Sequence, residues 1–176
     1  DRVFRFDLTS PYDVSTCAFA NQTSDLDTGT LQDGSNAGDI TEGTNNRLQG
    51  IEINNDGTKL FAIFHGATGQ DTRLLEYQLS TAYDLSTISI ITDAGIELND
   101  EVSNPQGIRF SPDGKRFWAV DHTGNPSTQD VTQISLDVAF STSSFTIDGT
   151  VSISSDIIQP RGIAFSAAGL KMYIGS

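Results

Sequence analysis

Short stretches in which apolar and polar residues alternate run along the chain, separated by turns rich in Gly, Asp and Asn. Alternation with a period of two is typical of β-strands, whose successive side chains point to opposite faces. In one repeat unit it predicts strands at about 48–54, 59–65, 73–79 and 87–92. No segment has sustained helical periodicity. The predicted fold class is therefore all-β.

A first repeated segment occurs three times, at 48–61, 105–118 and 160–173. Its anchor glycines Gly50, Gly107 and Gly162 are 57 and 55 residues apart. The first two copies contain an Asp-Gly pair, which favours a tight hairpin because glycine tolerates positive φ. The third copy has Ala168-Gly169 and so retains the glycine. Each copy thus predicts two antiparallel strands joined by a turn.

A second repeated segment lies between these copies, at 8–16, 79–87 and, more weakly, 136–142. Leu79 and Leu136 are 57 residues apart, whereas Leu8 and Leu79 are 71 apart. The linker after the first copy therefore holds an insertion.

Four short strands in every repeat of fifty-odd residues are typical of β-propeller blades. The motif Pro-x-Gly-Ile-x-Phe-Ser-x-Asp-Gly-x-Lys-x-aromatic, seen best at 105–118, resembles the blade motif of YVTN, NHL and gluconolactonase-like propellers. The Tyr-Asp-(Val/Leu)-Ser-Thr element at 12–16 and 83–87 is similar to repeats of secreted bacterial and phage-encoded propellers. The resemblance covers the whole chain and implies four-stranded antiparallel blades, but it does not imply a particular activity.

The predicted organisation is a single propeller segment of about three repeats with one blade split between the termini. Its parts are a half-blade (1–20), an acidic linker (21–47), a blade (48–92), a blade (106–148) and a half-blade (160–176). Known propellers have about four to eight blades, so three cannot close a ring. Three arrangements remain open: a segment of a longer propeller, a six-bladed ring of two copies joined head-to-tail, or a filament. The expected partners are further copies or flanking repeats that complete the split blade.

The formal net charge of −13 disfavours binding to nucleic acid and to anionic membranes. No apolar run is long enough to span a membrane. The single cysteine, Cys17, excludes an intrachain disulfide and lies in an alternating segment, where we expect a small buried side chain. A composition rich in Ser, Thr, Asn, Asp and Gly suits an extracellular protein of a cell or virion surface.

Two histidines occupy equivalent positions, since His65 and His122 each follow the anchor glycine by 15 residues. Each ends a predicted strand and opens a loop that closes with Gln-Asp, at Asp71 and Asp130. These loops lie on the face of a propeller that usually carries ligands, so the imidazoles are candidates for metal binding or acid–base chemistry. A repeated loop-stabilising hydrogen bond is the favoured alternative, because two histidines make a poor metal site.

The insertion contains Asp25, Asp27 and Asp33, and such oxygen-rich loops bind calcium. Asp-x-Asp-x-Gly begins like a calcium loop, but no glutamate stands at the twelfth position, so it is not an EF-hand. A solvated loop is the alternative. Asn21-Gln22-Thr23 is a glycosylation sequon at the start of this loop.

Two functions remain open from the sequence. The first is a non-enzymatic propeller scaffold that builds a surface assembly or binds a glycan or protein. The second is a metal-dependent hydrolase, because gluconolactonase-like enzymes carry Glu, Asn and Asp around a metal in the channel. The corresponding innermost positions here are Glu52, Arg109 and Arg161, and they do not form an acidic cluster.

Overall fold

The computed structural model describes the chain except residues 25, 27–46, 66–71, 99–100 and 123–128. Its regular structure is β, apart from two three-residue 3₁₀ turns, η1 (Val14–Thr16) and η2 (Leu85–Thr87). The predicted all-β class is confirmed. No helix in the described part of the chain is long and apolar enough to cross a membrane.

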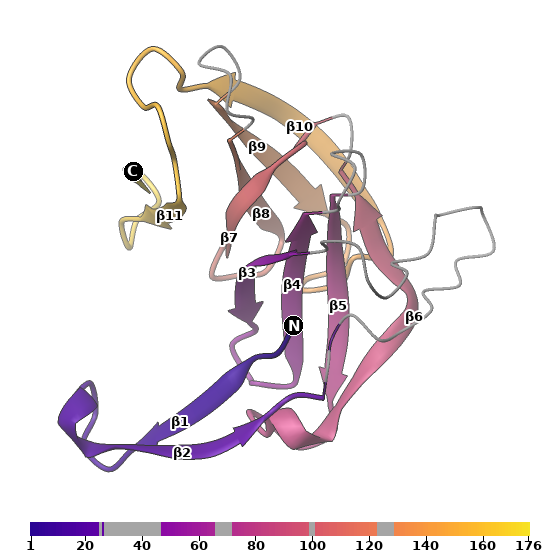
Figure 1. Ribbon diagram of the computed structural model, residues 1–176. Helices are drawn as coiled ribbons and strands as arrows, with labels where there is room; N and C mark the ends of the chain where they lie inside the picture. Colours follow the sequence, from indigo (N-terminus) through magenta and orange to yellow (C-terminus); the bar gives the residue numbers. More distant parts are fainter. Residues whose placement is uncertain (25, 27–46, 66–71, 99–100, 123–128) are drawn as a thin grey trace.

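The strands form two four-stranded sheets flanked by two hairpins (Figure 1). The N-terminal hairpin contains β1 (Phe4–Leu8) and β2 (Cys17–Gln22). The first sheet contains β3 (Arg47–Ile53), β4 (Lys59–His65), β5 (Arg73–Leu79) and β6 (Ile88–Glu97). The second sheet contains β7 (Pro105–Phe110), β8 (Arg116–His122), β9 (Gln129–Leu136) and β10 (Phe145–Ser152). The C-terminal hairpin contains β11 (Gly162–Phe165) and β12 (Met172–Gly175).

Within each sheet and hairpin, every strand pairs antiparallel with the next strand along the chain. The strands predicted for the first sheet are found within a residue or so, except that β6 continues to Glu97. The tight turns are also as predicted, since Gly57, Gly114 and Gly169 have φ of 73°, 68° and 69°. Local pattern and turn chemistry therefore agree with the observed strands.

The sheets are stacked through their first strands, because β3 lies beside β7 and β7 lies beside β11 (Figure 1). At the crossing points the anchor glycines come together. A Cβ added to Gly50 would lie 3.1 Å from the Cα of Gly107, and one added to Gly107 would lie 3.1 Å from the carbonyl oxygen of Arg161. A Cβ added to Gly162 would meet nothing within 4 Å. Two of the anchor glycines, Gly50 and Gly107, thus pack closely on the next unit, whereas the third, Gly162, has no neighbour there.

The core between the first and second sheets is built around aromatic rings. The ring of Phe110 lies 4.5 Å from that of Phe61, 5.3 Å from that of Phe117 and 5.7 Å from that of Phe140, measured between centroids. Phe61 and Ile63 belong to this core, whereas the alternate residues of β4 pack on the other face of the sheet. The predicted alternation along 59–65 is therefore confirmed, with both faces buried.

A second core lies between the first sheet and the N-terminal segment, and it corrects one expectation. Leu26 is 6% exposed and packs there, and its carbonyl oxygen accepts a hydrogen bond of 3.1 Å from Tyr77 Oη. Thr23 is buried as well. The start of the predicted solvated loop thus covers the first sheet.

A buried carboxylate joins the first and second sheets. Glu76 Oε1 accepts from Lys59 Nζ at 2.5 Å, and Glu76 Oε2 accepts from the backbone nitrogen of Thr142 at 2.8 Å. Lys59 Nζ also donates to the carbonyl oxygen of Phe140 at 2.8 Å. The charge of Glu76 is therefore compensated by an ion pair and by hydrogen bonds across the interface.

Two residues of strands, Ile51 and Cys17, are exposed, although Cys17 was expected to be buried. The exposed fraction of Ile51 is 42%, against 7% for its repeat equivalent Ile108. Ile108 packs on the first sheet, whereas within the described residues no strand of the N-terminal hairpin covers Ile51. Cys17 is also exposed, because it lies in a two-stranded hairpin rather than a full sheet.

Candidate functional site

An aromatic residue covers the turn glycine in each four-stranded sheet. Tyr83, at φ 61°, lies over Gly57 and donates its backbone N–H to the carbonyl oxygen of Gly57 at 2.7 Å. Phe140, at φ 52°, lies over Gly114 with the corresponding bond at 2.9 Å. Positive φ is strained for a bulky side chain, so these contacts hold the rings in an unusual conformation.

The third such pair is divided between the two hairpins. Tyr12 has φ 62°, like its repeat equivalents, but its side chain is 98% exposed. Gly169 has the same turn conformation as Gly57, but a Cβ there would meet nothing within 4 Å. The N-terminal hairpin carries the aromatic residue and the C-terminal hairpin carries the glycine, and the two hairpins are separate in Figure 1.

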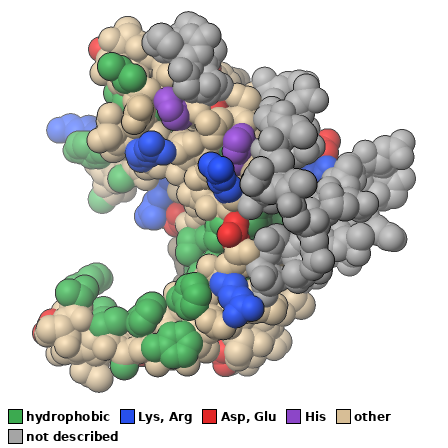
Figure 2. Space-filling view, viewed as in Figure 1, with side chains coloured by type: hydrophobic (Ala, Val, Ile, Leu, Met, Phe, Trp, Pro, Cys, Tyr) green, Lys and Arg blue, Asp and Glu red, His purple; other side chains and the backbone are tan. Residues whose placement is uncertain are grey.

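The N-terminal hairpin exposes a continuous hydrophobic face. Phe4, Phe6 and Leu8 alternate on β1, and Phe19 lies opposite Phe6 with the ring centroids 5.8 Å apart. In Figure 2, hydrophobic side chains follow this hairpin on the side that borders the hollow of the molecule. Phe6 is 53% exposed, whereas its repeat equivalent in the second sheet, Ile134, is fully buried. Such a face marks an interaction site more often than a free surface.

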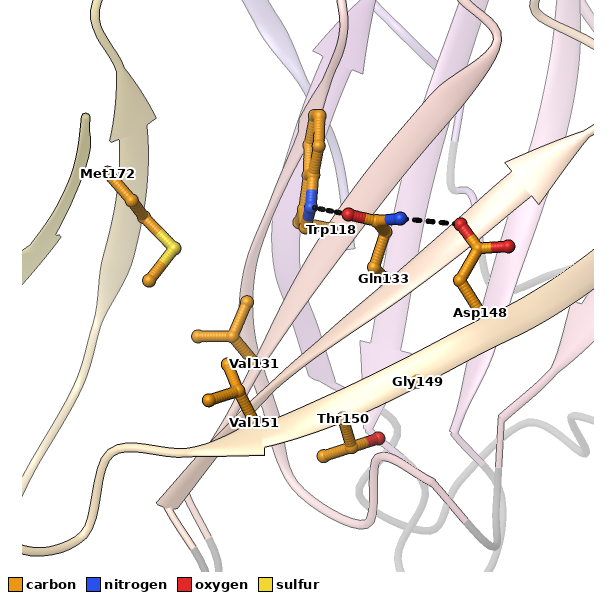
Figure 3. A pocket seen from close by; sticks show the side chains of 8 residues that line it. All are labelled: Trp118, Val131, Gln133, Asp148, Gly149, Thr150, Val151 and Met172. Atoms are coloured by element: carbon orange, nitrogen blue, oxygen red, sulfur yellow. Dashed lines mark hydrogen bonds between the residues drawn. The ribbon is translucent and has the colours of Figure 1, made fainter. Parts of the chain in front are cut away.

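An open cavity of about 370 Å³ lies between the second sheet and the C-terminal hairpin (Figure 3). Trp118 Nε1 donates to Gln133 Oε1 at 3.1 Å, and Gln133 Nε2 donates to Asp148 Oδ2 at 2.6 Å. Hydrogen bonds from the side chains of Gln133 and Ser135 lower the pKa of Asp148 below its ordinary value. The remaining lining residues are Val131, Gly149, Thr150, Val151 and Met172.

The chemistry of this cavity favours an apolar guest. The indole N–H of Trp118 and the side-chain amide of Gln133 are already engaged along the Trp118–Asp148 chain, so they do not require a ligand atom. Val131 and Val151 are paired across β9 and β10, and Met172 points toward them from β12 (Figure 3). A partner would therefore gain mainly by placing apolar side chains against these three residues.

The predicted histidine sites lie at the ends of β4 and β8. Burial and the positive charge of Arg47 lower the pKa of His65, and the negative charge of Asp121 opposes them. His122 Nδ1 is buried without a hydrogen-bond partner among the described residues. The structure therefore places Asp121 of the second sheet near His65 of the first, a relationship between sheets that the sequence did not indicate. Metal binding or acid–base chemistry at these residues stays a prediction.

The two aspartates that close the histidine loops were the other candidates on this face. Asp130, on β9, is opposite Asp121 on β8. Asp71 lies outside the described residues. Within the described part of the chain, no group of three or more His, Cys, Asp or Glu side chains could hold a metal ion.

The proposed calcium ligands Asp25, Asp27 and Asp33 also lie outside the described residues. Asn21, of the sequon, is half-buried, and its Nδ2 donates to Asp84 Oδ1 at 2.7 Å. The nitrogen that would carry a glycan is thus engaged with the first sheet. Glycosylation stays a prediction.

The innermost polar residues bind one another. Arg109 Nη1 donates to Glu52 Oε1 at 3.0 Å, and Arg161 Nη1 donates to Gln106 Oε1 at 2.8 Å. Burial raises the pKa of Glu52, and the positive charge of Arg109 opposes the shift. The one carboxylate offered by these positions is therefore already paired.

Comparison with known proteins gives no match: neither a protein-family model nor a curated protein matches the chain.

Residues that the sequence reasoning missed include Tyr12, Gln133 and Asp148. Tyr12 could have been found, because it aligns with Tyr83 in the second repeated segment while lacking a turn glycine in its own hairpin. Gln133 and Asp148 carry no motif, and only the open cavity reveals them.

Proposed function

We propose that the chain is a non-enzymatic scaffold built of β-propeller blades, which works as a structural or binding module of an extracellular or virion-surface assembly. The observation that carries this proposal is the stacking of the anchor glycines. Gly50 packs on Gly107, Gly107 packs on the strand of Gly162, and the same surface is open beyond Gly162. Because this contact recurs between successive units and the equivalent surface at Gly162 is uncovered, a further blade could pack there in the same way.

The two hairpins supply what that further blade needs. By repeat equivalence, β11 and β12 are strands one and two of a blade, whereas β1 and β2 are strands three and four. Flanking repeats of a longer propeller, a six-bladed ring of two copies and an open filament all satisfy this requirement. Between the ring and the filament, the rotation from one copy to the next decides.

The binding role rests on the surface rather than on a catalytic centre. The net charge of −13 and the Ser, Thr and Asn content suit an exposed protein that contacts glycans or other proteins. No nucleic acid is expected as a partner, because the acidic surface repels phosphates.

The metal-dependent hydrolase is the weaker candidate. A lactonase-type site needs carboxylates free to hold a metal, and Glu52 is ion-paired with Arg109. A bound calcium or zinc ion held by three or more carboxylates would favour the hydrolase over the scaffold.

Light scattering on the 176-residue chain at increasing concentration tests the scaffold. We expect a particle of two or more copies. The mass of one copy at every concentration would contradict the proposal.

A further inference from the structure

We propose that β12 of one copy pairs antiparallel with β1 of a second copy in one defined register, with Tyr12 of the second copy covering Gly169 of the first. The inference rests on the proposed scaffold and names its partner surface. The two four-stranded sheets already contain the equivalent strand pairs and backbone hydrogen bonds.

The register follows from the second and third strands of the complete sheets. In the first sheet Leu60 lies opposite Tyr77 and Phe61 lies opposite Glu76. In the second sheet the equivalent pairs are Phe117 with Ile134 and Trp118 with Gln133.

The repeat spacing gives the equivalent residues of β12 and β1, so the same pairing can be applied to these two strands. It sets Met172 opposite Phe6, and Tyr173 opposite Arg5. It also sets Lys171 opposite Asp7, so this register brings together opposite charges.

Backbone groups outside the strands agree with this pairing. Leu79 N donates to Thr58 O at 2.7 Å in the first sheet, and Leu136 N donates to Lys115 O at 2.8 Å in the second. The corresponding bond between copies would run from Leu8 N to Leu170 O. A second bond would run from Tyr12 N to Gly169 O, as it does from Tyr83 N to Gly57 O.

The hydrophobic face of the N-terminal hairpin then meets the cavity of Figure 3. In the complete interface, Ile134, Leu136 and Ile147 pack in one core with Leu74 and Ile96. The repeat equivalents of the first three are Phe6, Leu8 and Phe19, all exposed.

The repeat equivalent of Leu74 is Val131, which pairs with Val151 as Leu74 pairs with Ile96. Both valines line the cavity. The exposed apolar residues of the N-terminal hairpin therefore match the apolar lining of the cavity beside the C-terminal hairpin.

The occupant is a second copy because the two hairpins are complementary: β11 and β12 correspond to strands one and two of a sheet, and β1 and β2 correspond to strands three and four. The Tyr12 loop is already in the conformation of the equivalents that cover a turn glycine, with φ 62° against 61° for Tyr83. Its docking would need little rearrangement, which lowers the cost of association.

Cysteine cross-linking tests the register. Cys17→Ser removes the one native thiol, and Arg5→Cys with Tyr173→Cys then places two thiols directly opposite each other, at a separation that a disulfide can bridge. The matched control carries Arg5→Cys with Met172→Cys, which is one position out of register, so that its thiols point to opposite faces.

Under mild oxidation we expect disulfide-linked dimers and larger species from the first variant, and at least about tenfold less from the control. Equal cross-linking of both variants, or a disulfide formed within single chains, would overturn the proposal. The particle mass of the Cys17→Ser chain distinguishes failure of the proposed register from failure of the proposed scaffold. If that chain assembles but the designed pair does not cross-link, the register is wrong and the scaffold stands. If it remains a single copy, both fail.

Discussion

The ring of Tyr83 lies so close over Gly57 that a Cβ on the glycine would be 2.4 Å from the ring atom Cδ2. Phe140 stands in the same relation to Gly114, with a distance of 2.2 Å. In each four-stranded sheet this contact joins the segment after the third strand to the turn between the first and second strands. At Gly169 the ring is missing.

Gly57→Ala should therefore destabilise the protein strongly. The new methyl group would displace the ring of Tyr83, and φ of 73° is strained for alanine, so we expect a loss of about 2–5 kcal/mol in the free energy of unfolding. Gly169→Ala is the matched control in dilute single copies, where φ is 69° but the surface is open, and it should cost only about 1–2 kcal/mol there. Denaturant titration measures both, and equal losses would show that the ring contact does not matter.

Gly107→Ala tests the stacking of the sheets. Its Cβ would lie 3.1 Å from the carbonyl oxygen of Arg161, so β7 and β11 would have to separate, at a cost of about 1–3 kcal/mol. Gly162→Ala meets nothing within 4 Å and should change the stability of a single copy by less than about 0.5 kcal/mol. A neutral Gly107→Ala would contradict close packing at this crossing.

Phe110→Ala tests the aromatic core. Phe110 is 5% exposed and contacts three other rings, so its truncation should cost about 3–5 kcal/mol. Ile51→Ala, at an exposed position on the equivalent strand, should cost less than about 1 kcal/mol. A loss below about 1 kcal/mol for Phe110→Ala in urea titration would show that the assigned core is wrong.

Tyr12→Ala separates folding from assembly. The side chain is fully open in one copy, so the circular dichroism spectrum and the unfolding midpoint of dilute protein should hardly change. The assembly should weaken about fivefold, since burying about half of the ring, as in the equivalent Tyr83, contributes on the order of 1 kcal/mol. Thr9→Ala in the same hairpin is the control, because its equivalents Ser80 and Asp137 are exposed in complete sheets. Unchanged assembly of Tyr12→Ala in sedimentation would exclude the ring as a docking group.

The buried carboxylate of Asp121 predicts a pH dependence. Burial raises the pKa of Asp121, and hydrogen bonds from the backbone nitrogens of Asn104 and Ser103 oppose the shift. The folded protein therefore holds this proton more tightly than the unfolded chain. Its stabilising effect is present at low pH and is lost as the pH rises through the raised pKa.

The difference in unfolding free energy between the wild type and Asp121→Asn isolates this group. We expect that difference to fall as the pH rises from about 4 toward neutrality. A difference that is constant, or that increases with pH, would contradict the assigned burial.

The strands were predictable because alternation and repetition are local properties of the sequence. The period of two along 59–65 and the Asp-Gly turns fix where β4 begins and how it pairs, whatever lies beyond the sheet. The equivalence of Gly50, Gly107 and Gly162 also indicated that the units are alike, although not that the glycines themselves meet.

Burial could not be predicted in the same way, because it depends on the neighbouring sheet. Ile51 and Ile108 occupy the same place in the repeat, but only Ile108 has a sheet to pack against. Leu26 shows the converse, since a residue of an acidic insertion covers the core. The cavity beside Trp118 likewise depends on how the second sheet and the C-terminal hairpin are placed, and no motif indicates that placement.

The most direct measurement is a three-dimensional density map of the particle that the 176-residue chain forms. The account predicts four strands in every sheet, with β12 of one copy beside β1 of the next and the ring of Tyr12 over Gly169. A map in which the two hairpins remain two-stranded, or in which another surface joins the copies, would contradict it.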